Sequence, residues 1–558
     1  MITLKENQLI IETKTQSVVM QDGAIVSLKS KSGKSFVNVP DVSAVNALSA
    51  VYMHNRSVNI SNGSQSKIKC MLINDYCAEF RVHSWHGDGM VMVYEDQFSG
   101  DLIVEPSVFS GQHGLRSVRW AIPGIDPELE VIAPLYQGIK MKQDDPMILG
   151  GRWVWPQLWE AGFVIMQGKS DGFWVHCEDT KYKYKTLSIG LKDMPNSLGF
   201  ETDAYGPIDN NSSAGGLQWR INCYDGDWHV PAKTYKDWLY NAYNLAEQKA
   251  VRKDWIYDIK AAISWFPTEK EALDLVAKYA DPTKMLLHVP NWREFKYDQN
   301  YPDYTPSQKG ADFIEYGKKL GFHMMPHGNS VDMDPTHPVY QLIREYEYID
   351  IESKARHGWG WSQGGYLGVP SSNQNLTENQ KYNVMIKVHP ASRMWQSILR
   401  EELEKAVKQL EVDTIFIDVT LCSQNLHNSL LDSTTSSEGM NQLIRHIGQI
   451  NGGIPVGGEG LNEITFQGLS FAQAHLFNSH QGTAGGLERC GGIDLNEFLF
   501  GDLCRTIGYS SLGGRNDAEK LRMRIHEEHG AIPTCTIGVN ELKDPNAEIL
   551  RVLAATKK

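Results

Sequence analysis

Two acidic residues end short apolar segments in the second half of the chain. Asp418 closes the run Ile-Phe-Ile-Asp at 415–418, and Glu459 follows Pro-Val-Gly-Gly at 455–458. A buried parallel strand reads as a continuous apolar run, so a carboxylate at its end is costly unless it faces a polar cleft. Two such residues on successive strands of a β/α barrel would meet at its C-terminal mouth. Paired carboxylates in that position suggest glycoside hydrolysis.

The two acids differ in length and setting, which suggests different roles. Asp418 is short and fixed at a strand end, and it fits a nucleophile that stays ionised. Glu459 is longer and lies between glycines that would let a substrate approach, and it fits a proton donor with a raised pKa. Glu463, expected in the following helix, is the rival proton donor. The other interpretation of either acid is a helix cap or an ion pair, and the spacing of 41 positions does not fix the stereochemistry.

Aromatic and polar side chains near other strand ends supply candidate sugar contacts. Some follow the first three strands, and two tryptophans belong to an aromatic-rich insertion at about 350–390, which is too long for an ordinary loop. The candidate substrate-binding residues are Trp265, Trp292, Asp298, His327, Asn329, Trp359 and Trp361. The alternative for each is a purely structural, packed residue.

The elements that must position these residues alternate between strand and helix from about residue 255. The expected strands are 259–264, 285–289, 322–325, 414–419, 454–456, 471–477 and 532–537, with one more that the pattern does not place. The expected helices include 269–279, 307–320, 393–410, 438–450, 517–529 and 546–554. Such alternation over roughly 300 residues predicts a (β/α)8 barrel at 255–558.

The first half of the chain has a different pattern. Residues 1–230 hold short strand-like segments separated by Gly, Asn, Asp and Ser, which is typical of an antiparallel β-sandwich. A helix that opens at Pro231 and runs to about Gln248 predicts a helical linker at 231–254. The fold class is therefore a multidomain protein with an N-terminal β-sandwich and a C-terminal TIM barrel.

Composition narrows the function classes. The 558 residues carry a net charge of −13, which argues against nucleic acid or an anionic membrane as a partner. No apolar run of about 18 residues and no signal-like N-terminus is present, so we expect a cytoplasmic protein; secreted or periplasmic is the alternative if a signal was removed. Neither a tight metal-ligand spacing nor a phosphate-binding glycine loop occurs, so no cofactor and no metal are predicted.

Four stretches together carry a family resemblance: 172–176, 226–238, 388–419 and 458–460. They are similar to segments of bacterial α-glycosidases related to the endo-α-N-acetylgalactosaminidases and α-galactosidases. Thr420 and Leu421 depart from the aromatic or glycine residues expected after the nucleophile.

The resemblance implies a retaining mechanism, with Asp418 as nucleophile and Glu459 as acid/base. It implies α-linked galactose or N-acetylgalactosamine as the substrate sugar, in an oligosaccharide or glycoconjugate. Two alternatives remain: an α-glycosidase of the same fold for another sugar, and a non-catalytic carbohydrate-binding protein. The oligomeric state is unknown.

Overall fold

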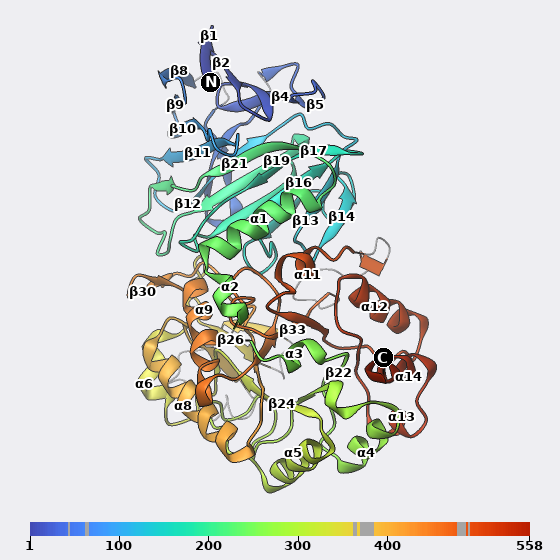
Figure 1. Cartoon of the computed structure of the whole chain (residues 1–558). Helices are drawn as coiled ribbons and strands as arrows, with labels where there is room; N and C mark the ends of the chain where they lie inside the picture. Colours follow the sequence, from blue (N-terminus) through green and yellow to red (C-terminus); the bar gives the residue numbers. More distant parts are fainter. Residues whose placement is uncertain are drawn as a thin grey trace. The chain divides into compact units, whose positions relative to one another are not determined.

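The chain forms two compact units, Met1–Ala242 and Tyr243–Lys558. The computed structural model describes residues 1–42, 45–61, 66–250, 252–360, 365–368, 384–476, 487–488 and 492–557 (Figure 1). The division falls within the segment predicted as a helical linker. That segment contains two helices, α1 (His229–Ala242) and α2 (Leu245–Ala250), instead of the single helix expected. Asn244 between them has a left-handed backbone with φ of 52°, which ends the first helix.

The first unit is built from antiparallel strands, which confirms the predicted sandwich class. One sheet contains β1 (Ile2–Lys5), β2 (Gln8–Glu12), β3 (Gln16–Gln21), β4 (Ala24–Ser30) and β5 (Ser35–Asn38) in that order. A second sheet runs β14 (Ile139–Lys142), β13 (Glu130–Ala133), β16 (Phe163–Gln167), β17 (Asp171–His176), β21 (Trp219–Asp225), β11 (Leu102–Phe109), β10 (Gly87–Glu95), β9 (Cys77–Ser84) and β8 (Lys67–Asn74), with β20 (Ser213–Gly215) paired to β11. The third runs β15 (Gly151–Val154), β18 (Lys185–Leu191), β19 (Met194–Asp203), β12 (Leu115–Ile122), β6 (Leu48–Tyr52) and β7 (Ser57–Asn59).

Aromatic side chains from two of these sheets meet in the core of the first unit. Trp219 on β21 packs against Phe200 on β19, with ring centroids 4.9 Å apart, and Trp159 stacks on Trp219 at 6.2 Å. All three are fully buried. Contacts of this size between facing sheets are what hold a β-sandwich together.

The second unit is a parallel barrel, as predicted. Its strands are β22 (Ala261–Ile263), β23 (Met285–Val289), β24 (His323–Asn329), β29 (Ile415–Asp418), β32 (Val456–Glu459), β33 (Phe471–Ala474), β34 (Arg505–Gly508) and β35 (Thr534–Cys535). They pair in the order of the chain, β22 also pairs with β35, and a parallel bridge between Ile507 and Ile532 joins the two ends of the sheet. Apolar side chains such as Leu286, Met325 and Phe416 fill part of the core.

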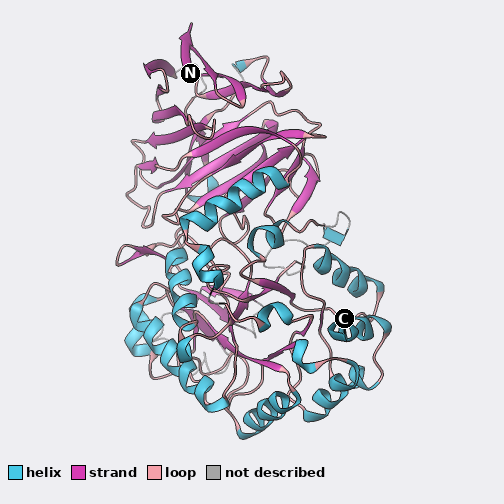
Figure 2. Ribbon diagram, viewed as in Figure 1, coloured by secondary structure: helices cyan, strands magenta, loops and turns pink. Residues whose placement is uncertain are grey.

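Helices surround the barrel strands (Figure 2). They are α3 (Trp255–Asp258), α4 (Lys270–Tyr279), α5 (Gln308–Leu320), α6 (Tyr340–Ile343), α8 (Arg393–Leu410), α9 (Ser436–Ile447), α11 (Leu495–Phe500), α12 (Asp517–Glu528), α13 (Val539–Lys543) and α14 (Ala547–Ala554). The longest, α8, starts at Ser392, whose hydroxyl accepts a hydrogen bond from the amide of Trp395. Its buried face includes Leu399 and Leu403, and Leu403 lies against β24, where a Cβ at Gly328 would be 3.2 Å from its Cδ2.

The predicted insertion contributes a small antiparallel sheet. Its strands are β25 (Asp332–Met333), β28 (Val384–Lys387), β26 (His357–Gly360) and β27 (Gly365–Gly368), in that order. A further hairpin joins β30 (Leu430–Leu431) to β31 (Thr434–Thr435). Trp361 and the side chain of Trp359 lie outside the described residues, so their proposed sugar contacts stay predictions.

Several element bounds differ from those expected. Strand β32 begins at Val456 and includes Glu459, whereas the sequence placed it at 454–456. Strand β24 extends to Asn329, so His327 and Asn329 lie within it. Glu463 lies in a run of turns and not in a helix.

Candidate active site

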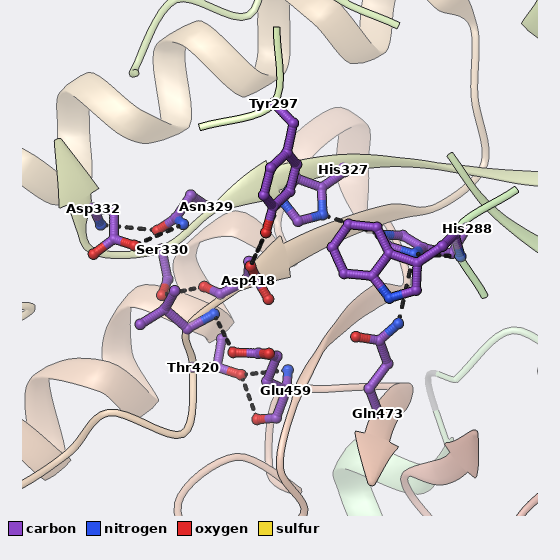
Figure 3. Close-up of polar contacts among 12 residues, drawn as sticks. His288, Tyr297, His327, Asn329, Ser330, Asp332, Asp418, Thr420, Glu459 and Gln473 are labelled. Atoms are coloured by element: carbon purple, nitrogen blue, oxygen red, sulfur yellow. Dashed lines mark hydrogen bonds and ion pairs between the residues drawn. The ribbon is translucent and has the colours of Figure 1, made fainter. Parts of the chain in front are cut away.

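Asp418 and Glu459 lie side by side at the carboxyl ends of adjacent barrel strands. Ile417 on β29 pairs in register with Gly458 on β32, and each acid is the next residue along its strand. Each carboxyl group shifts the pKa of the other, and the two side chains are only 6% and 7% exposed. Figure 3 shows them at the centre of a polar cluster. The structure therefore brings together the pair that the sequence singled out.

The backbone after Asp418 holds the other acid. Val419 adopts a left-handed conformation with φ of 64°, and its N–H donates to Oε2 of Glu459 at 2.8 Å. The hydroxyl of Thr420 donates to the carbonyl of Glu459 at 2.7 Å and accepts from its N–H at 2.8 Å. A positive φ is unusual for a β-branched residue and costs roughly 1–3 kcal/mol. The left-handed backbone at Val419 directs its N–H to Glu459, and the hydrogen bonds from Val419 and Thr420 hold Glu459 beside the strand that carries Asp418.

The packing of the barrel requires the glycines on either side of Glu459. A Cβ at Gly458 would lie 2.7 Å from the hydroxyl of Thr420 and 2.9 Å from Leu469. Gly460 has φ of 69°, and a Cβ there would lie 2.9 Å from the Cβ of Leu421. Close packing and backbone conformation therefore require glycine at both positions.

Other groups on the second unit hold Asp418. The hydroxyl of Tyr297 donates to Oδ2 at 3.1 Å, and Nε2 of His327 lies 3.8 Å from the same oxygen. Ser330 donates to the backbone carbonyl of Asp418 from its amide at 3.0 Å and from its hydroxyl at 2.6 Å. The carboxylate thus faces hydrogen-bond donors on one side and Glu459 on the other.

Two buried histidines form a chain of hydrogen bonds behind Asp418. The backbone N–H of Trp265 donates to Nδ1 of His288 at 3.3 Å, which places the His288 proton on Nε2. That Nε2 lies 3.0 Å from Nδ1 of His327, so it donates there, and the proton of His327 is left on the Nε2 that faces Asp418. Burial lowers the pKa of His288 to about 3 and that of His327 well below its ordinary value. Both rings are therefore neutral, and His327 presents an N–H to the site.

Glu459 has a histidine of its own. Nε2 of His475 lies 2.8 Å from Oε1 of Glu459, and the ring stacks on Tyr509 with centroids 4.1 Å apart. Burial lowers the pKa of His475 to about 4, so this ring too is neutral at ordinary pH. It adds a polar contact to Glu459 without adding a charge.

Burial and mutual repulsion shape the titration of the acid pair. Burial raises the pKa of Asp418 well above its usual range, and the charge of Glu459 raises it further. Burial also raises the pKa of Glu459, although hydrogen bonds from Asp418 and Val419 oppose the rise. The pair therefore keeps a proton to higher pH than two separate carboxyl groups would.

The remaining candidates fall into two groups. Trp265, with φ of 57°, lies at the site, where its ring packs edge-on against Tyr297 at 5.3 Å. Asp298 is 4% exposed, and its charge raises the pKa of Tyr297, so it also lies near the site. Trp292 is fully buried and its indole donates to the carbonyl of His327 at 2.9 Å, so we place it beneath the site and not among the sugar contacts.

Asn329 stabilises a turn of the backbone. Its amide donates to Asp332 at 3.2 Å, and its carbonyl oxygen accepts from the amides of Val331 and Asp332. These bonds shape the turn from β24 into β25. Asp332 in turn forms a buried ion pair with Lys387 at 2.7 Å, and the charge of Lys387 lowers the pKa of Glu459.

Sequence reasoning missed Tyr297, His475, Tyr509 and the Asp332–Lys387 pair. His475 follows Ala474, the last residue of β33, so the strand-end rule that found Asp418 would have found it as well. Tyr509 follows β34, the strand that the sequence did not place. Among the residues that the structure describes, no group of three or more His, Cys, Asp or Glu side chains is arranged to hold a metal. Within the same residues, no helix is long and apolar enough to cross a membrane.

Comparisons with known proteins connect this fold to glycoside hydrolases. A family model described as a domain of unknown function (DUF6259) matches residues 217–429, which include Asp418 but not Glu459. No curated protein sequence matches the chain.

Among solved structures, ligand-free α-N-acetylgalactosaminidase NagBb from Bifidobacterium bifidum has a TM-score of 0.67 at 12% identity, covering 100% of this chain and 93% of that one. A GH31 family sulfoquinovosidase from E. rectale has a TM-score of 0.55 at 10% identity, covering 100% and 82%. A GH36 α-galactosidase, AgaA from Geobacillus stearothermophilus, has a TM-score of 0.49 at 8% identity, covering 99% and 85%. NagBb is of a kind that the sequence resembles, and at 12% identity its likeness establishes a common fold.

Proposed function

We propose that the protein is a retaining α-glycosidase that acts on α-linked galactose or N-acetylgalactosamine. The observation that carries this proposal is the buried pair of Asp418 and Glu459 at the carboxyl ends of adjacent barrel strands. Inverting enzymes separate their carboxyl groups by about 6.5–9.5 Å to admit a water, whereas retaining enzymes hold them about 5–5.5 Å apart. Carboxyl groups that end adjacent strands, each close enough to shift the pKa of the other, favour the retaining arrangement.

In the first step, Asp418 attacks the anomeric carbon and the glycosidic C–O bond breaks. The leaving oxygen takes a proton from Glu459, and the sugar becomes an ester of Asp418. In the second step, ionised Glu459 takes a proton from water, and the water oxygen attacks the anomeric carbon and releases Asp418. Two inversions at one carbon retain its configuration. The scheme needs Glu459 protonated and Asp418 ionised when the sugar is bound.

The choice of sugar rests on similarity. NagBb, which shares the fold across the whole of this chain, is an α-N-acetylgalactosaminidase for which a complex with GalNAc is known. The sulfoquinovosidase neighbour supports a second candidate, an α-glycosidase of the same fold for another α-linked sugar. A neutral N–H on His327 and the half-buried ring of Trp265 suit a sugar hydroxyl and a sugar face respectively.

The test is the release of a nitrophenyl group from a panel of aryl α- and β-glycosides that includes α-galactoside, α-N-acetylgalactosaminide, α-glucoside and α-sulfoquinovoside. We expect turnover of one α-glycoside, with Asp418→Asn and Glu459→Gln each reducing kcat/KM by 10³-fold or more, about 4 kcal/mol. Matched controls are Asp413→Asn and Glu411→Gln, which lie just before β29 at its opposite end and should retain activity.

Azide distinguishes the roles of the two acids. In Glu459→Gln, azide should attack the glycosyl ester and give an α-glycosyl azide, because the nucleophile is intact. In Asp418→Asn, any azide product should have the β configuration, because only one displacement takes place. No turnover on any member of the panel, with sugar binding unchanged in both variants, would replace the proposal with a carbohydrate-binding protein.

A further inference from the structure

A second cavity lies at the opposite end of the barrel strands from the acid pair. It has a volume of about 470 Å³, and its lining includes Ile454 and Pro455 before β32 and Gln467, Gly468 and Ser470 before β33. These residues precede the strands whose far ends carry Glu459 and His475. A strand of four residues spans roughly 10 Å or more, so the cavity is distinct from the candidate active site. Figure 1 locates β33 and the helices α2 and α9, which also contribute to its wall.

The cavity is positively charged. The residues that line it in the described part of the chain include Arg252, Lys253 and Arg445 and no carboxylate. None of the three forms an ion pair within 4 Å with an acid that the structure describes. Lys249, three residues before Arg252, does form an ion pair, with Asp502 at 3.4 Å. Three cations without ion pairs therefore surround one cavity, so its charge is opposite in sign to the net charge of the chain, −13.

Arg252 is the least exposed member of this cationic group. Its Nη1 donates to the hydroxyl of Ser470 at 2.9 Å and to the carbonyl of Gly468 at 3.4 Å, and its Nη2 donates to the carbonyl of Gln467 at 3.5 Å, whereas its buried Nε has no hydrogen-bond partner. The side chain of Arg445 also lies near Gly468, where a Cβ would be 3.3 Å from its Cγ. Burial lowers the pKa of Arg252. A half-buried guanidinium with an unused N–H is a site for an oxyanion.

The opposite wall leaves room for a ligand larger than an inorganic ion. Gly452 and Gly453 line the cavity, and a Cβ at either would meet nothing within 4 Å. Gln449 and Gln467 add amide groups that can bond to hydroxyls. We propose that this cavity binds a small molecule bearing a phosphate or sulfate group, with Arg252, Lys253 and Arg445 around the oxyanion.

Calorimetric titration of the full chain with inorganic phosphate, inorganic sulfate and glucose 6-phosphate tests the proposal, with glucose as the uncharged control. We expect saturable binding of the anions and none of glucose, weakening as salt is raised. Equal affinity for phosphate and glucose 6-phosphate would identify the oxyanion itself as the ligand. Tighter binding of glucose 6-phosphate would show that the rest of the cavity contacts the sugar.

The double variant Lys253→Gln/Arg445→Gln should bind each anion at least tenfold more weakly, because it removes two charged contacts worth roughly 1.4 kcal/mol or more together. Both side chains are exposed, so the variant should fold. Lys249→Gln makes the same charge change beside the cavity and should bind normally. Asp418→Asn should also bind normally, so failure of the glycosidase proposal would leave this one intact. Absence of saturable binding, or equal binding by wild type and the double variant, would overturn it.

Discussion

The coupled titration of Asp418 and Glu459 makes the site sensitive to pH in a defined direction. Activity requires one acid ionised and the other protonated, so the rate of an α-glycosidase built on this pair should follow a bell-shaped curve. Burial raises the pKa of both groups, so the alkaline limb should lie well above the ordinary pKa of a glutamic acid. A pH profile of kcat/KM on the best aryl glycoside would check this. An alkaline limb near pH 4 to 5 would contradict it.

Removal of the Tyr297 hydroxyl should move the acidic limb. This hydroxyl donates to Asp418 and stabilises its ionised form, so Tyr297→Phe should raise the pKa of Asp418. The acidic limb should then move to higher pH, with kcat/KM at the optimum reduced about tenfold for the loss of one charge-assisted bond. Tyr316→Phe, whose hydroxyl bonds Asp274 elsewhere on the barrel, is the matched control and should leave the profile unchanged.

The buried pair should also make the wild-type protein less stable as pH rises. The folded pKa of Asp418 exceeds its unfolded value, so its contribution to stability is complete at low pH and declines as pH rises through the folded pKa. Asp418→Asn removes that decline. The free energy of unfolding of the variant, measured in urea, should exceed that of wild type at pH 8, by about 1.4 kcal/mol for each unit of the raised pKa, and approach it at pH 4.

Asp193→Asn is the control for this stability measurement. Asp193 is exposed and has a left-handed backbone with φ of 72°, which asparagine also adopts. Its urea midpoint should follow that of wild type at both pH values. A midpoint for Asp418→Asn below that of wild type at pH 8 would show that the carboxylate is stabilising in the folded state.

The sequence identified the acids and some of their neighbours, such as Trp265 and His327, but not Tyr297 or His475. Asp418 and Glu459 are detectable because an acid after an apolar run is anomalous in a strand. Tyr297 lies in the long connection between β23 and α5, where no periodicity relates a residue to the barrel mouth. The partners of the histidine chain, His288 and His327, are inside strands, and only the register between β23 and β24 brings their rings together.

At the scale of elements, strand β32 depends on glycine. A methyl group at Gly458 would press on Thr420, which bonds both backbone groups of Glu459. Gly458→Ala should therefore destabilise the protein by about 1–3 kcal/mol and reduce kcat/KM by displacing Glu459. Denaturant unfolding and aryl glycoside kinetics measure the two effects. Gly448→Ala, at a position where the nearest atom is 3.4 Å from a new Cβ, should alter neither.

The same glycines explain why the sequence placed β32 too early. Ile454 and Val456 read as strand, whereas Gly457 and Gly458 have low strand propensity, although the structure pairs them with Phe416 and Ile417 on β29. Strand β34 escaped prediction because it is four residues long and begins with Arg505. The long helix α8 was predicted to the residue, since its cap and its apolar face are both local signals.

At the scale of the whole molecule, each unit has its own sheets and its own buried core. No described sheet includes strands from both Met1–Ala242 and Tyr243–Lys558. We therefore expect two transitions in differential scanning calorimetry of the wild-type chain. Gly458→Ala should lower the midpoint of one by a few degrees and leave the other in place. A single transition that moves as a whole would show that the two units unfold together.

The left-handed turn at Val419 contributes to the site through its main chain, which the residue type does not reveal. The group that holds Glu459 there is a main-chain N–H, which every residue except proline possesses. Glycine or asparagine would adopt the same turn with less strain. Position 419 therefore requires a backbone conformation and not a particular side chain. Another chain could hold its acid by the same main-chain hydrogen bond with a different residue at this position.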